Sequence, residues 1–137
     1  MNKKNLIIAL ALITLAGAFF VTKTNTNSVV PQPEQKIVSG VTLKIDFGDD
    51  NITTFENLEA EGATAFSILE AITSQNNIAF ETQKYDFGIF VMSINGKEGD
   101  AQMAWIYFVN GKPGEVAADA MALNPGDIVE WKYIKPE

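Results

Sequence analysis

Two aromatic-rich segments, each alternating with a period of two, constrain the fold of this chain most strongly. Residues 105–109 are Trp-Ile-Tyr-Phe-Val and precede Asn-Gly, whereas residues 128–133 are Ile-Val-Glu-Trp-Lys-Tyr and follow Asn-Pro-Gly-Asp. Side chains that alternate in this way lie on opposite faces of a strand, and the flanking residues are typical of turns. The pattern therefore predicts two strands of a small sheet that has one aromatic face.

The composition of the chain excludes several classes of function. It contains no Cys, His or Arg, so all ten basic residues are Lys. Disulfides, thiolate zinc sites, Ser-His-Asp triads and bidentate Arg clamps are therefore excluded. From residue 37 onward 16 acidic residues face 6 Lys, a net charge of −10, which is the wrong sign for a nucleic-acid surface. We expect no catalytic site, no cofactor and no nucleic-acid partner.

Residues 1–22 have the pattern of a signal peptide or signal anchor. Lys3 and Lys4 precede residues 6–21, a run of sixteen residues without a charge. Cleavage after the small residues at 16–18 would release a secreted protein, whereas an uncleaved helix of this length would span about 24 Å and anchor the chain in a membrane. We favour the anchor, and in both cases the basic end stays inside and the remainder lies outside the cytoplasm.

Residues 23–36 form a polar linker, and residues 37–137 carry the periodic patterns of a folded domain. Residues 41–47 alternate without error, residues 48–51 form a turn, and residues 52–58 are expected to return as a second strand. A helix is expected to start with Thr64 as its N-cap and to end at Asn76-Asn77. Its apolar stripe would face a sheet and consists of Ala65, Ile68, Leu69 and Ile72.

The second half of the domain contains further strands. Residues 88–94 are apolar on both faces and are expected to form a central strand, followed by an Asn-Gly turn and a loop over residues 97–103. The aromatic strand at 105–109 and the final strand from Ile128 complete the order. We predict an α+β fold: a β-grasp-like mixed sheet with one crossing helix, preceded by an N-terminal hydrophobic helix.

These ordered segments resemble the transcobalamin-like C-terminal domain family, which belongs to the soluble-ligand-binding β-grasp type. The resemblance covers nearly all of residues 37–137. It rests on the strand at 41–47, the Glu-Gly-Ala-Thr helix start at 61–64, and the segments 88–96, 105–111 and 126–133. It implies an extracytoplasmic, non-enzymatic module that binds cobalamin-like or other small soluble ligands.

The candidate ligand-binding residues follow from this reasoning. Trp105 and Tyr107, with Trp131, would form a stacking platform for a planar ligand or, alternatively, pack the core under the helix. Asn95 and Gly96 would contact a ligand beside the loop at 97–103 or simply form a hairpin turn. The complete candidate set is Asn95, Gly96, Trp105, Tyr107 and Asn110.

Two further functional hypotheses complete the prediction. The oxygen-rich turn formed by Asp46, Asp49, Asp50 and Asn51 lacks the ligand spacing of a calcium loop, so we expect no metal site. The alternative to a small-ligand module is a cell-surface module that docks protein or polysaccharide. A concave pocket of suitable size beside Trp105 and Asn95 would favour the first, whereas a flat apolar patch or an unprotected edge strand would favour the second.

Overall fold

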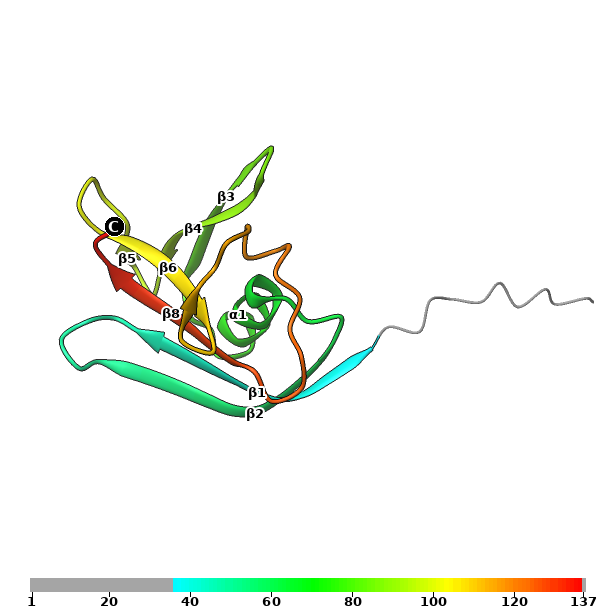
Figure 1. Cartoon of the computed structure of the whole chain (residues 1–137). Helices are drawn as coiled ribbons and strands as arrows, with labels where there is room; N and C mark the ends of the chain where they lie inside the picture. The colour runs from blue at the N-terminus through cyan, green and yellow to red at the C-terminus, as the bar shows by residue number, and fades with distance from the viewer. Residues whose placement is uncertain (1–35, 137) are drawn as a thin grey trace, which may run out of the picture. The chain divides into compact units, whose positions relative to one another are not determined.

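The computed structural model describes residues 36–136, which contain eight strands and one helix (Figure 1). The strands are β1 (Ile37–Asp46), β2 (Ile52–Glu61), β3 (Phe80–Tyr85), β4 (Gly88–Ile94), β5 (Lys97–Glu98), β6 (Ala104–Val109), β7 (Lys112–Pro113) and β8 (Ile128–Ile134), and the helix is α1 (Ala65–Gln75). Strands therefore dominate the described part of the chain.

The larger sheet has five strands in the order β2-β1-β8-β6-β7. The first and last long strands, β1 and β8, run parallel, with Leu43 paired to Val129, whereas the other pairs are antiparallel. The two aromatic segments of the sequence are β6 and β8, which are direct neighbours with Tyr107 opposite Trp131. The predicted aromatic face is thus confirmed as one face of this sheet.

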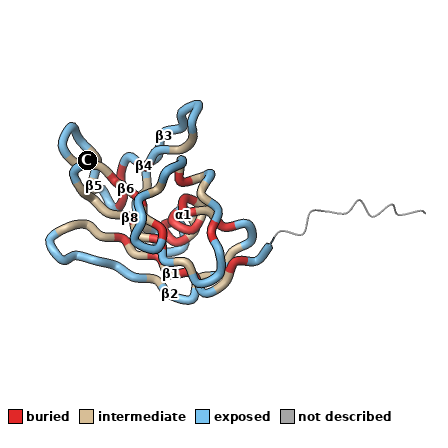
Figure 2. Tube along the Cα trace, in the orientation of Figure 1, coloured by how far each residue is buried: buried red, intermediate tan, exposed pale blue. Residues whose placement is uncertain are grey.

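A separate sheet of three strands has the order β3-β4-β5. The hairpin of β3 and β4 projects from the rest of the domain, and its tip is exposed (Figures 1 and 2). The β5 strand pairs only its two residues with the end of β4. The smaller sheet contributes Val91 and Ile94 of β4 to the common core.

The helix α1 packs into the core, as its apolar stripe predicted. Leu69 is fully buried, and it shares one hydrophobic cluster with residues of β1, β4, β6 and β8. Thr64 is the N-cap, and its side chain and that of Ser67 each accept a hydrogen bond from the other's backbone N–H. Beyond the helix, Asn77 has a left-handed φ of 53°.

The predicted fold class, an α+β fold with one β-grasp-like mixed sheet, is wrong: the domain is mostly β and has two sheets. One reason is β3, whose Glu-Thr-Gln-Lys core has no apolar alternation because both of its faces are exposed. The other reason is β4, which lies in the small sheet and leaves Phe90 and Met92 exposed. The sequence prediction therefore placed β4, an apolar strand, in the wrong sheet.

The predicted N-terminal hydrophobic helix lies outside the described residues, so it does not stand as part of the observed fold. Within residues 36–136, α1 is too short to cross a membrane.

Candidate functional site

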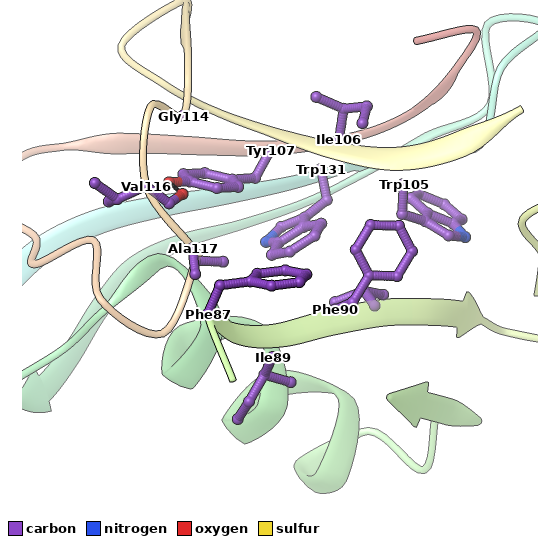
Figure 3. Close-up of a pocket in the computed structure, with 12 residues that line it drawn as sticks. Phe87, Ile89, Phe90, Trp105, Ile106, Tyr107, Gly114, Val116, Ala117 and Trp131 are labelled. Carbon is purple, nitrogen blue, oxygen red and sulfur yellow. Dashed lines mark hydrogen bonds between the residues drawn. The ribbon is translucent and has the colours of Figure 1, made fainter. Parts of the chain in front are cut away.

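An apolar pocket of about 180 Å³ opens between the β3–β4 hairpin, the inner face of β6 and the segment after β7 (Figure 3). Residues from each of these parts contribute to its wall, because the hairpin and the segment at 114–118 approach each other over the aromatic face of the larger sheet. The lining residues are Phe87, Ile89, Phe90, Val91, Trp105, Ile106, Tyr107, Gly114, Val116, Ala117, Ala118 and Trp131.

Five aromatic rings surround this pocket. The rings of Tyr107 and Trp131 are in contact, with centroids 5.5 Å apart, and they form the wall on the side of the larger sheet. Phe87 and Phe90 reach toward this wall from the hairpin (Figure 3). Phe87 is 72% exposed, so its ring lies at the rim. The site is suited to an apolar or aromatic group.

The segment at 114–118 is fixed to Tyr107. The Tyr107 hydroxyl donates a hydrogen bond to the carbonyl of Val116, and the backbone N–H of Gly114 donates to the carbonyl of Tyr107 at 3.1 Å. A Cβ on Gly114 would lie 1.9 Å from Cζ of the Tyr107 ring, so only glycine allows this approach. The ring of Tyr107 therefore shapes the pocket wall and also holds the loop that closes it.

The hairpin is fixed to the same segment at Gly88 and Ile89. The backbone N–H of Ile89 donates to Oδ1 of Asp119 at 3.1 Å. Gly88 has a φ of 138° and packs directly against Ala117. The carboxylate of Asp119 thus contacts the backbone of Ile89, which lines the pocket.

The environment of Tyr107 gives a test of this arrangement. Burial raises the pKa of the Tyr107 hydroxyl above its ordinary value of 10.0, and the negative charge of Asp119 adds to the increase. As the pH rises, the Tyr107 hydroxyl therefore loses its proton in the unfolded state before it does so in the folded state. The contribution of this hydroxyl to stability is complete below about pH 10 and falls as the pH rises through the folded pKa. We expect the difference in unfolding free energy between the parent and Tyr107→Phe to shrink between pH 9 and 11. Urea unfolding across this range measures it, and a pH-independent difference would contradict it.

The structure brings two of the five predicted site residues together. Trp105 and Tyr107 are 2% and 8% exposed, so their face of β6 belongs to the core, and both residues also line the pocket. The indole N–H of Trp105 donates to the carbonyl of Lys97 at 2.8 Å, which ties β6 to β5. The two rings are therefore a pocket wall and not an exposed platform.

The other three predicted residues lie elsewhere. Asn95 and Gly96 form the exposed turn between β4 and β5, with φ values of 52° and 75°. Asn110 lies at the opposite end of β6 from Trp105 and borders a different hollow of about 430 Å³. Its side chain donates to Asp127 and accepts from the N–H of Ile128, so it braces the start of β8. Binding of a ligand by these three residues stays a prediction.

Sequence reasoning missed the hairpin side of the pocket. Phe87 and Phe90 were not selected, because an unpatterned β3 hid the hairpin that presents them. A phenylalanine in the Asp86-Phe87 turn was the available signal, since turns seldom carry large apolar residues without a contact to make. Val116 gave no comparable signal within its Ala-rich segment.

Among residues 36–136 no group of three or more acidic side chains is placed to hold a metal ion. In the Asp46–Asn51 turn, Oδ1 of Asp46 instead accepts the backbone N–H of Gly48 at 2.8 Å. This contact is ordinary turn chemistry.

Comparisons with known proteins place this geometry in context. A family model described as "Domain of unknown function (DUF4430)" matches residues 62–135. Among curated proteins nothing matches the chain. A crystal structure from Ruminococcus gnavus ATCC 29149, described as a "putative metal binding protein", superposes with a TM-score of 0.60 at 20% identity, covering 72% of this chain and 98% of that one.

The crystal structure of haptocorrin in complex with Cbi superposes with a TM-score of 0.66 at 18% identity. The match covers 75% of this chain and 26% of haptocorrin, so the chain corresponds to about a quarter of that protein. At these identities the likeness concerns the fold, and the domain has the transcobalamin-like fold that the sequence resemblance implied.

Proposed function

We propose a function from the geometry of the pocket, because the chain belongs to a family whose description, Domain of unknown function (DUF4430), names none. The model of this family matches residues 62–135. The domain is a non-enzymatic binding module for a small soluble ligand, and the aromatic pocket between the β3–β4 hairpin and β6 is its binding site. The convergence of five rings on one concave site is the observation that carries this proposal. The fold shared with haptocorrin supports it.

The lining of the pocket favours binding over catalysis. None of its twelve lining residues is charged, and the hydroxyl of Tyr107 is already engaged with Val116. A raised Tyr107 pKa leaves this hydroxyl protonated at neutral pH, so it is not a base there. A pocket with this lining can select and hold a ligand, but it offers no activated acid, base or nucleophile for a reaction.

The size of the pocket limits what it encloses. At about 180 Å³ it is smaller than the roughly 300–1,000 Å³ of sites that bury a drug-sized molecule. A cobalamin-like ligand or another large compound would therefore insert one ring-sized part and leave the rest outside. Phe87 and Val116, which are exposed at the rim, would contact that outer part.

A ligand screen with a blocked pocket tests the proposal. We expect a compound from a panel of corrinoids, sugars and small organic molecules to raise the melting temperature of the full-length protein. Val116→Trp, which places a large ring at the rim, should remove this shift. Ile52→Trp is the matched control, since Ile52 on β2 is 54% exposed and Val116 is 51% exposed. Equal shifts in both variants would place the ligand outside this pocket.

We also propose that the domain works outside the cytoplasm, held at a membrane by residues 1–22. The support is the pattern of Lys3-Lys4 followed by the uncharged run at 6–21. The full-length protein should appear in the membrane fraction, with its domain accessible to external protease. A mature chain that begins at Phe19 in the medium would instead establish secretion.

A second candidate function is docking to a cell-surface protein or polysaccharide. The observation in its favour is the exposed apolar surface of the hairpin, where the rings of Tyr85 and Phe87 stack 5.2 Å apart and Phe90 and Met92 are also exposed. Tyr85→Ser, which lies outside the pocket lining, would weaken such docking and leave small-ligand binding intact.

A further inference from the structure

The chemistry of the pocket wall narrows the class of ligand beyond a small soluble molecule. The five rings of Phe87, Phe90, Trp105, Tyr107 and Trp131 line one space of ring size. The face of an aromatic ring carries negative partial charge, which attracts cations as well as apolar groups. The wall is thus suited to a neutral or positively charged group.

The polar hydrogens of these rings are already used inside the protein. The indole N–H of Trp105 donates to Lys97, that of Trp131 donates to the carbonyl of Ala65 at 3.2 Å, and the Tyr107 hydroxyl donates to Val116. No Lys lies among the lining residues, and the chain has no Arg. A bound carboxylate or phosphate would therefore lose its hydration without gaining a donor from a lining side chain.

Negative charges lie next to the lining residues. Asp119 holds the N–H of Ile89 at the pocket wall, as described above. Asp86 precedes Phe87 at the hairpin tip, and Glu115 lies between Gly114 and Val116. The lining itself is uncharged, and these three acidic residues adjoin it through that hydrogen bond or as neighbours in sequence. This distribution of charge complements a cation.

On the basis of the proposed binding function, we infer that the pocket binds the quaternary ammonium group of a small organic cation. Of the lining side chains only Tyr107 carries an oxygen, so the three N–H groups of a primary ammonium would find at most one side-chain acceptor. A methylated ammonium has no N–H to satisfy. Its charge interacts with the ring faces directly, as in aromatic cages that recognise choline and methyl-lysine.

The test compares three probes of similar size on the full-length protein. Choline carries the trimethylammonium group, 3,3-dimethylbutan-1-ol has the same shape without the charge, and ethanolamine carries a primary ammonium. Titrations followed by tryptophan fluorescence report on Trp105 and Trp131. We expect choline to bind roughly 10-fold more tightly than either of the other probes, which is the range of a desolvated cation–π contact.

Substitutions at the rim and wall locate the binding. Phe87→Leu keeps an apolar side chain and removes a ring, so choline should bind roughly 3- to 10-fold more weakly. Phe108→Leu is the matched control, because it makes the same change on β6 at a residue that does not line this pocket. Asp119→Asn keeps an oxygen for the N–H of Ile89 and removes the charge, so it should weaken choline binding and leave binding of the neutral probe unchanged.

The outcomes separate this inference from the proposed function. Equal affinity for choline and 3,3-dimethylbutan-1-ol would overturn the cation inference and leave an apolar ligand pocket in place. Absence of choline binding, together with a screen compound that Val116→Trp blocks, would overturn only the inference. If no probe or screen compound responds to Val116→Trp, both the inference and the proposed function fail.

Discussion

Replacement of Leu69 by Ala is expected to lower the free energy of unfolding by about 2–5 kcal/mol, the usual cost of removing a buried leucine side chain and leaving a cavity. Leu69 is fully buried on α1, in the cluster that joins the helix to both sheets. The cavity would lie in this cluster, among buried residues of α1, β1, β4, β6 and β8. Urea unfolding of the parent and the variant measures the difference.

The matched control for this change is Glu70→Ala on the next residue of α1. Glu70 is exposed, and alanine favours a helix, so its effect should stay within about 0.5 kcal/mol. If Leu69→Ala costs no more than Glu70→Ala, the helix does not pack into the core as described.

The parts of the fold that were predictable from sequence are those with a strong period and a local signal. The alternation in β1, β6 and β8 and the stripe on α1 all arise because one face of each element is buried. The N-cap at Thr64 depends on a side chain three residues from its partner, so it also requires no tertiary information.

The parts that were not predictable depend on contacts between distant segments. Phe80–Tyr85 becomes a strand through its pairing with β4, although its own side chains are mostly exposed. Met92 is apolar and exposed, so hydrophobicity alone placed its strand in the wrong sheet. Strand pairing across a hairpin and the division into two sheets depend on tertiary contacts, which local periodicity does not indicate.

The candidate site likewise contains residues that were predictable from local sequence and residues that were not. Trp105 and Tyr107 were selected because aromatic residues on one face of a strand form a continuous surface, and they do line the pocket. Asn110 was selected with them, but its side chain is engaged by Asp127 in the turn before β8. The hairpin and the segment at 114–118 complete the pocket only after the chain has folded, so Phe87 and Val116 were not identified.

Replacement of Gly88 by Ala is expected to lower the free energy of unfolding by about 2–6 kcal/mol. Gly88 has a φ of 138°, a conformation that costs a side chain about 1–3 kcal/mol. Its new Cβ would also lie 2.3 Å from Cβ of Ala117 and 2.6 Å from Oδ1 of Asp119, and overpacking of this kind costs about 1–3 kcal/mol more. Urea unfolding again provides the measurement.

Two controls separate the strain at Gly88 from the steric contact. Gly96→Ala places a side chain at a φ of 75° with no atom within 4 Å, so it should show the cost of backbone strain alone. In the Gly88→Ala background, Ala117→Gly removes the clashing methyl group and should recover part of the loss, which a double-mutant cycle measures as coupling. Without coupling, and with a cost equal to that of Gly96→Ala, the hairpin would not be held against the segment at 114–118. The pocket between them would then lack its fixed wall, because the contact between Gly88 and Ala117 is where the two segments meet.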